Sequence, residues 1–256
     1  MIKKNIKEFL DEKVALYNNS SFIETDPISI PHLFTKKEDI EIAGFLAATI
    51  AWGQRKTIMN NASRLMQLMD MAPHDFVVNA GASDYKPFQK FVHRTFNGED
   101  CVYFLRALKN IYKNYGSLEG AFLNGMKKED EDVRNSISGF REVFFGIAHP
   151  QRTRKHVSDP SAKSSAKRLC MYLRWMVRKD KCGVDFGLWK RIRSSQLCLP
   201  LDVHTGNISR KLGLLHRTQN DWQAVQEITG VLRSFDKNDP VKYDFALFGL
   251  GAFEKF

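Results

Sequence analysis

Several features that mark common protein classes are missing from this sequence. No run of roughly 18 or more apolar residues occurs, which excludes a membrane-spanning helix. The opening stretch MIKKNIKEFLDEK is charged throughout and lacks the apolar centre of a secretory signal, so we expect a cytoplasmic location. The chain has only 4 cysteines, and no two of them form a C-x-x-C pair. Because zinc and thioredoxin-type sites use such pairs, we expect no metal and no cofactor.

Positive charge, by contrast, is in excess, and the excess is local. The chain carries 39 Lys and Arg against 29 Asp and Glu, for a formal net charge of +10. Residues 152–217 hold 16 of these bases and four of the acids, a net +12, while the rest of the chain has 23 bases and 25 acids. Localised positive charge favours nucleic acid as a partner, because phosphate contacts release counterions. The alternative is a basic surface kept for solubility.

Helical periodicity dominates the chain. Apolar residues recur at steps of three and four through residues 39–70, and an interruption near Gly53 predicts two helices joined by a short turn. Further helices are predicted over 76–81, 85–91, 100–115, 118–126, 133–147, 167–179, 202–212, 221–234 and 242–253. Strand signals are scarce. The sequence therefore predicts an all-α fold, a single two-lobed unit with approximate lobes 1–60 plus 215–256 and 61–214.

Individual residues are predicted to begin or end these helices. Thr35 and Glu38, three residues apart, form a capping-box pattern. Gly116 is a plausible C-terminal glycine for the helix before it. Asp185, in VDFGLW, is interpreted as a helix N-cap.

The segment LPLDVHTGNISRKLGL (residues 199–214) places one carboxylate, Asp202, at the start of a predicted helix. That helix ends with Arg210 and Lys211. For a single Asp in this position, the simplest interpretation is an N-cap.

The same segment resembles the V-D-x-H-V-x-R-v-x-x-R-L-g-l motif of the helix-hairpin-helix DNA glycosylase superfamily, the group of endonuclease III and 8-oxoguanine glycosylase. AGFLAATIAWGQRKTIMNNASRLM resembles the early helix pair of that superfamily, and DPVKYDFALFGLG resembles its closing helix. The chain also resembles a bacterial family of uncharacterised proteins with the signature K-R-L-x-M-x-L-R-W-M-V-R, here KRLCMYLRWMVR.

The resemblance implies a helix-hairpin-helix glycosylase-like fold and roles for particular residues. Asp202 matches the catalytic Asp, and Lys167 matches the nucleophilic Lys by its position, with Lys163 as a rival. Gln54 falls where family members wedge a side chain into the DNA; capping of the following helix is the alternative. The stretch DPSAKSSAKRL stands in place of the usual hairpin but lacks G-x-G, so a divergent hairpin is expected. No Cys follows Cys198, so the iron–sulfur cluster of endonuclease III is not expected.

These residue types suit cleavage of an N-glycosidic bond. A carboxylate stabilises the positive charge that develops on the sugar, and an amine can form a Schiff base at C1′. The flipped base would lie in a pocket formed by Phe245, Phe248 and Asp244, with Trp175 as a further candidate; core packing is the alternative for the aromatic residues. The remaining residues predicted to contact DNA are basic: Arg152, Arg154, Lys155, Lys163, Arg168, Arg210 and Lys211.

We therefore predict a base-excision repair glycosylase that acts on a damaged base in double-stranded DNA, with an associated β-lyase activity if Lys167 is the nucleophile. We expect it to be monomeric, nucleoid-associated and free of membrane contact. The alternative is a non-catalytic DNA- or RNA-binding protein that retains the fold, and the degenerate hairpin favours that alternative.

Overall fold

The computed structural model of the chain describes residues 2–254 and 256, most of which are helical. The α-helices are α1 (Ile2–Tyr17), α2 (Ser20–Thr25), α3 (Lys37–Thr49), α4 (Arg55–Gln67), α5 (Pro73–Asn79), α6 (Gly98–Tyr115), α7 (Leu118–Leu123), α8 (Arg134–Phe144), α9 (Lys167–Val177), α10 (Val203–Lys211), α11 (Trp222–Phe235) and α12 (Tyr243–Ala252). Short 3-10 turns connect them: η1 (Pro27–Ser29), η2 (Pro31–Leu33), η3 (Pro87–Lys90), η4 (Gln151–His156), η5 (Pro160–Ala162), η6 (Ser194–Gln196) and η7 (Pro240–Lys242). The described residues form no strand, only an isolated bridge between His93 and Phe96. The all-α prediction is confirmed.

The chain divides into two compact units. The first unit contains Met1–Ile23, Lys128–Arg134 and Asp159–Phe256, and the second contains Glu24–Lys127 and Asn135–Ser158. These boundaries differ from the predicted lobes. Residues 24–60 belong to the second unit, where α3 packs against α4 and α5, and residues 159–214 belong to the first, where α10 packs against α12.

The helix pair predicted around Gly53 is formed by α3 and α4. The predicted end of α6 is also confirmed, since Gly116 takes a left-handed conformation with φ of 73° at its C-terminus. The capping box of Thr35 and Glu38 is wrong. The N-cap of α3 is Lys36, which makes Glu38 the second residue of the helix rather than the third.

An aromatic core holds the second unit together. Phe45 of α3, Phe104 of α6 and Phe144 of α8 are buried, and the centroids of their rings lie 4.7 to 5.8 Å apart. Phe140, one turn earlier on α8, packs edge-on against Phe45 with a centroid separation of 5.4 Å. Aromatic rings at these separations attract one another beyond their burial. This cluster holds the inner face of α6 against α3 and α8.

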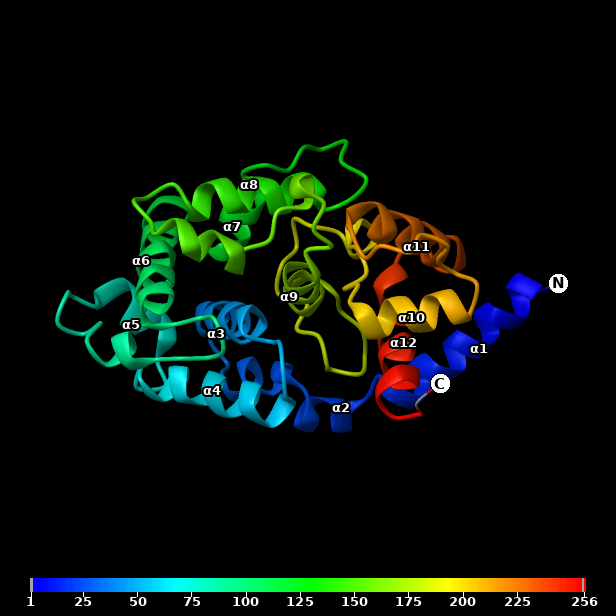
Figure 1. Ribbon diagram of the computed structural model, residues 1–256, viewed down its shortest axis with the longest axis horizontal. Helices are drawn as coiled ribbons and strands as arrows, with labels where there is room; N and C mark the ends of the chain where they lie inside the picture. The colour runs from blue at the N-terminus through cyan, green and yellow to red at the C-terminus, as the bar shows by residue number, and fades with distance from the viewer. Residues whose placement is uncertain (1, 255) are drawn as a thin grey trace. The chain divides into compact units, whose positions relative to one another are not determined.

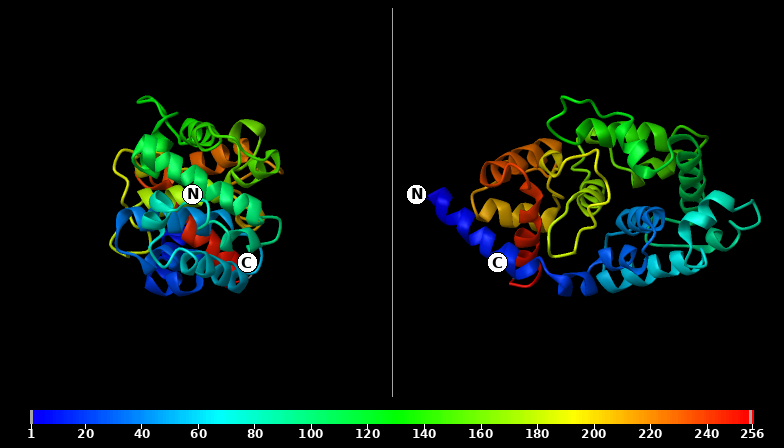
Figure 2. Two further views of the ribbon diagram at one scale, coloured as in Figure 1. Left: turned by 90° about the vertical axis from the view of Figure 1, so that its left-hand side faces the viewer. Right: turned by 180° about the vertical axis from the view of Figure 1, so that it is seen from behind.

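Helix α9 belongs to the core of the first unit. All its residues from Leu169 to Val177 are buried, including Arg174. A helix that is covered on every side is a core element rather than a surface one. Helix α12 packs against α1 and against α10, and both ribbon views place α12 (red) beside α1 (dark blue) (Figure 1, Figure 2). The first unit thus contains the beginnings of α9, α10 and α12, which supply the candidate site.

Candidate functional site

The two residues predicted to be catalytic lie next to each other in the first unit. Lys167 is the first residue of α9, and Asp202 immediately precedes α10. The Nζ atom of Lys167 is 3.7 Å from Oδ2 of Asp202. The two side chains keep 28% and 34% of their surface exposed. The pair is therefore formed, and both side chains are accessible to solvent.

Asp202 uses its two carboxylate oxygens for different contacts. Its Oδ1 accepts a hydrogen bond of 2.9 Å from the backbone N–H of Thr205, which caps α10. Its Oδ2 faces Lys167. The Asp202 carbonyl also accepts a bond of 3.0 Å from the side-chain amide of Asn220. Asp202 is thus the N-cap that the residues alone suggest, and the capping bond holds its other oxygen toward the amine.

Asp244, in the first turn of α12, is electrostatically coupled to this pair. Its carboxylate forms an ion pair with the buried guanidinium of Arg174. Burial raises the pKa of Asp244 to about 6, with Arg174 and Lys167 acting in the opposite direction and Asp202 in the same direction. Protonation of Asp244 in weak acid therefore changes the field that acts on Lys167 and Asp202.

The sequence analysis missed the buried ion-pair network behind Asp244. Arg174 donates to Asp185 at 3.2 Å, and Arg178 donates to Asp185 and to Asp239, each at 2.9 Å. Asp185 is an ion-pair partner, and no described helix begins at it, so its interpretation as an N-cap is wrong. The sequence offers only a partial signal, which is that Arg174 lies among apolar residues from Leu169 to Val177, since a guanidinium buried among apolar residues needs a carboxylate partner.

The stretch that stands in place of the family hairpin bends without glycine. Asp159 caps η5, and α9 begins a few residues later. Lys163 and Ala166 have φ values of 63° and 47°, in the left-handed region that favours glycine. Lys163 is exposed and lies outside α9. Of the two candidate amines, only that of Lys167 is carried by the helix and paired with Asp202.

A basic depression also lies in the first unit. It has a volume of about 240 Å³, and its lining includes Arg134, Lys163, Arg217 and Trp222. Arg217 forms an ion pair with Asp221. Among the described residues, the side chains of Arg134 and Lys163 form neither a hydrogen bond nor an ion pair. Two cations in this depression are therefore available to an anion.

Two arginines predicted to contact DNA make contacts within the second unit. The guanidinium of Arg152 donates to the buried carboxylate of Asp100 at 2.5 Å. That of Arg154 lies 5.2 Å from the ring centroid of Phe145. Both groups are engaged in internal contacts, which the count of charges along the chain does not reveal. Lys155, between them, is exposed.

The basic residues predicted on α9 and α10 have mixed surroundings. Arg210 donates to the carbonyl of Arg217 at 2.8 Å and to Asn220 at 2.7 Å, so it holds the loop after α10. Lys211 is exposed and donates to the carbonyl of Phe256 at 3.1 Å. Arg168 is half-buried, and burial lowers its pKa to about 10.

Gln54 lies in the second unit, at the N-cap position of α4. Its side chain is exposed and makes no capping hydrogen bond. Capping by the side chain therefore does not account for Gln54, and its role as a wedge stays a prediction.

Two of the aromatic residues assigned to the base pocket or its edge belong to the core. Phe245 and Trp175 are both 0% exposed. The Phe245 ring packs against Phe22, with centroids 5.0 Å apart, and beneath the guanidinium of Arg174 at 4.4 Å. Phe248 is half-buried and also contacts Phe22, at 5.6 Å. Phe245 and Trp175 are therefore core residues, as the alternative interpretation predicted.

The fold and site define an all-α protein with an accessible Lys–Asp pair where two helices begin. The chain belongs to the family described as protein of unknown function (DUF2400), which matches residues 26–253 and so includes Lys167 and Asp202. No curated protein and no solved structure matches the chain. None of the described helices has the length and apolar character needed to cross a membrane. Nor do the described residues include a group of three or more His, Cys, Asp or Glu side chains placed to hold a metal ion.

Proposed function

We propose that this chain is a DNA glycosylase of the helix-hairpin-helix superfamily that removes a damaged base from double-stranded DNA in base-excision repair. The observation that carries the proposal is the 3.7 Å separation between Lys167 and Asp202. These are the two residues that the resemblance, taken from two separate stretches of sequence, assigns to catalysis. A purely fortuitous resemblance gives no reason for them to meet at an accessible position.

The chemistry follows from the two side chains. The target base leaves the helical stack, and the Asp202 carboxylate stabilises the positive charge that develops on the sugar. The neutral amine of Lys167 attacks C1′, the C1′–N bond breaks, and the base leaves with a proton. In the resulting N,O-acetal the C1′–O4′ bond breaks, O4′ takes up a proton, and the C1′–Lys167 bond becomes a Schiff base, from which β-elimination breaks the strand on the 3′ side. Asp202, at 3.7 Å from Lys167, would accept the proton that the ammonium loses once the two groups approach to hydrogen-bond distance, and would return it to O4′ when the sugar ring opens.

DNA binding is supported by the cations that remain available. Arg134 and Lys163 in the basic depression carry positive charge without an internal partner among the described residues. Both belong to the same unit as the Lys167–Asp202 pair. Contacts of this kind bind the phosphate backbone and carry no sequence information.

Borohydride trapping tests the proposal, because it makes the Schiff base permanent. The protein is incubated with duplexes that carry oxidised, alkylated or deaminated bases, and with an abasic duplex. We expect wild type and Lys163→Gln to be trapped on a cognate lesion, and Lys167→Gln not to be trapped. Lys163→Gln tests the rival amine, which is exposed and not paired with Asp202. Because Lys163 is also assigned to DNA binding, trapping is measured with the protein in excess over its dissociation constant for each variant.

Other outcomes of the same experiment have distinct meanings. Trapping of Lys167→Gln at wild-type yield moves the nucleophile to another amine. Base excision without trapping makes the enzyme monofunctional, with water as the nucleophile. Binding without excision or trapping on every lesion contradicts the proposal.

The second candidate is a non-catalytic DNA- or RNA-binding protein with the same fold. The observation that favours it is the stretch before α9, where η5 and the left-handed Lys163 and Ala166 stand in place of a glycine hairpin. In that case the Lys167–Asp202 contact is only an ion pair that joins α9 to α10. This candidate would be supported if wild type and Lys167→Gln bind DNA with equal affinity and neither of them excises a base.

A further inference from the structure

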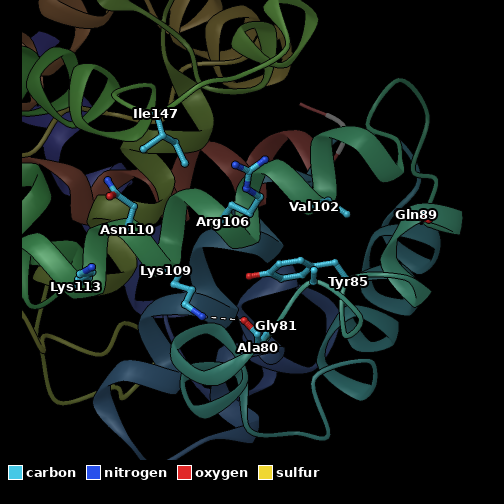
Figure 3. A pocket seen from close by; sticks show the side chains of 11 residues that line it. Ala80, Gly81, Tyr85, Gln89, Val102, Arg106, Lys109, Asn110, Lys113 and Ile147 are labelled. Atoms are coloured by element: carbon cyan, nitrogen blue, oxygen red, sulfur yellow. Dashed lines mark hydrogen bonds between the residues drawn. The ribbon is translucent and has the colours of Figure 1, made fainter.

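A pocket in the second unit lies along the outer face of α6 (Figure 3). Its volume is about 590 Å³, within the range of roughly 300–1,000 Å³ that small-molecule sites occupy. Helix α6 contributes Val102, Arg106, Lys109 and Lys113 to the lining. These residues are three or four positions apart and so share one face of the helix. The aromatic core beneath fixes that face in place.

The pocket is strongly basic. Its lining includes three cations, Arg106, Lys109 and Lys113, and no carboxylate. Lys109 donates to the carbonyl of Ala80 at 2.8 Å, the dashed line in Figure 3. Among the described residues, the side chains of Arg106 and Lys113 form neither a hydrogen bond nor an ion pair. Cations gathered without acidic partners favour an anion as the ligand.

An aromatic ring lies opposite these cations. Tyr85 is half-buried, and its ring extends beneath Arg106 with the hydroxyl toward Lys109 (Figure 3). Burial raises the pKa of Tyr85, with Asp84 acting in the same direction and Arg106 in the opposite one, so the phenol stays neutral and does not oppose an anion. The Asp84 carboxylate accepts from the backbone N–H of Gly81 at 2.8 Å and does not itself line the pocket. The ring of Phe76 supports it edge-on, with centroids 6.5 Å apart. The Tyr85 ring can stack against a flat group such as a nucleobase, and the neighbouring cations can bind a phosphate.

We propose that this pocket binds a nucleoside phosphate, with the base against Tyr85 and the phosphate on Arg106 and Lys113. Arg106 supplies a forked guanidinium suited to phosphate oxygens, and Lys113 supplies a point charge two turns further along the same face of α6. The nucleotide can be free or can be the 5′-phosphorylated end of single-stranded DNA. The site does not depend on the glycosylase proposed above, because none of its residues belongs to the Lys167–Asp202 pair.

Isothermal titration calorimetry of the full chain tests the site with defined probes. The probes are 2′-deoxyadenosine 5′-monophosphate, deoxyadenosine, inorganic phosphate, and hexadeoxyadenylate with and without a 5′-phosphate. We expect the monophosphate to bind and Tyr85→Leu to weaken it about tenfold, the size of effect that loss of base stacking produces. The double variant Arg106→Gln/Lys113→Gln should lose at least as much. Lys56→Gln/Arg64→Gln on α4 is the matched control, because it removes one exposed Lys and one exposed Arg outside the pocket.

The outcomes separate the sources of the nucleotide and can overturn the site. Binding of the phosphorylated hexamer but not the unphosphorylated one identifies a DNA end, and binding of the monophosphate alone identifies a free nucleotide. Inorganic phosphate binding as tightly as the monophosphate, with no effect of Tyr85→Leu, overturns the proposal, as does failure of every probe at millimolar concentration. Unchanged thermal midpoints of the variants show that they are folded.

Discussion

Lys167 and Asp202 are 35 positions apart in the chain, yet Nζ of one lies 3.7 Å from Oδ2 of the other. Each is held by the beginning of its own helix, α9 for the lysine and α10 for the aspartate. Position at a helix end restricts both side chains more than a loop would. The contact therefore depends on the packing of the first unit and not on local sequence.

Two substitutions of Asp202 separate its roles. Asn retains an oxygen that accepts from Thr205, so Asp202→Asn should leave the free energy of unfolding nearly unchanged, whereas Asp202→Ala should lower it by about 1 kcal/mol. Base excision, if the proposed function holds, should fall by several orders of magnitude in both, because both remove the charge that meets the sugar cation. Urea unfolding and single-turnover excision measure the two effects. If the excision rate of Asp202→Asn stays within about tenfold of the wild-type rate, which is roughly 1.4 kcal/mol of activation free energy, Asp202 is an N-cap and not a catalytic residue.

Helix positions could be predicted from the sequence, because apolar periodicity and cap residues are local signals. Lys167 and Asp202 were singled out by the resemblance to the glycosylase motifs and not by these local signals. The state of individual charges could not be predicted. Nothing in the sequence around Arg152 distinguishes it from an exposed arginine, and the apolar neighbours of Arg174 indicate burial but not a partner. Only tertiary packing places Arg152 on Asp100 and Arg174 on Asp185 and Asp244. The division into units was also beyond reach, since it depends on which helices pack together rather than on where helices begin.

Removal of Arg152 should therefore weaken the fold. The Asp100 carboxylate is fully buried, and Arg152→Met leaves it with His156, Thr153 and the backbone N–H of Asn97 as partners. Because Arg152 is itself partly exposed, we expect a loss of about 1–3 kcal/mol in the free energy of unfolding rather than the larger cost of breaking a fully buried pair. Lys155→Met, on the exposed neighbour, is the control and should stay within about 0.5 kcal/mol. Equal urea midpoints for the two variants would contradict the assignment of Arg152 to the fold.

Phosphate contacts in the basic depression predict a change in the salt dependence of DNA binding. Each phosphate neutralised contributes about −0.9 to the slope of log K against log salt concentration. Arg134→Gln/Lys163→Gln should therefore make the slope less steep by nearly 2, measured by fluorescence anisotropy with a labelled duplex. Lys237→Gln, an exposed lysine outside the depression, should change it by less than one contact. An unchanged slope in the double variant removes the depression from the DNA interface.

Asp244 predicts a pH-dependent stability of known sign. Its pKa is about 6 in the fold and 3.8 without the surrounding structure, so between these values the folded state binds more protons than the unfolded one. This group's contribution to stability therefore falls as pH rises from about 4 to about 6, by roughly 3 kcal/mol in total at 1.36 kcal/mol per pKa unit. The variant Asp244→Asn has no titrating group at this position and therefore serves as the reference. The free energy of unfolding of wild type minus that of Asp244→Asn should decline across this window in urea experiments, and parallel pH profiles would exclude the shift.

The close approach of α1 and α12 makes Gly249 sensitive to the addition of a single methyl group. A Cβ built on Gly249 would lie 2.1 Å from Cδ2 of the Tyr17 ring. That ring cannot easily move, because it stacks on Phe253 with centroids 5.5 Å apart and its hydroxyl donates to Glu254. Gly249→Ala should therefore separate the two helices and lower the free energy of unfolding by about 1–3 kcal/mol, despite the better helix propensity of Ala.

Gly251, two residues further along α12, is the control for this prediction. A Cβ there meets no atom closer than 3.5 Å, from Cγ1 of Ile208, which is ordinary van der Waals contact. Gly251→Ala should be neutral or slightly stabilising, because Ala is favoured over Gly in a helix. Thermal and urea unfolding of both variants measure the difference. If Gly249→Ala is as stable as Gly251→Ala, Tyr17 does not pack against α12 in the way that fixes this end of the first unit.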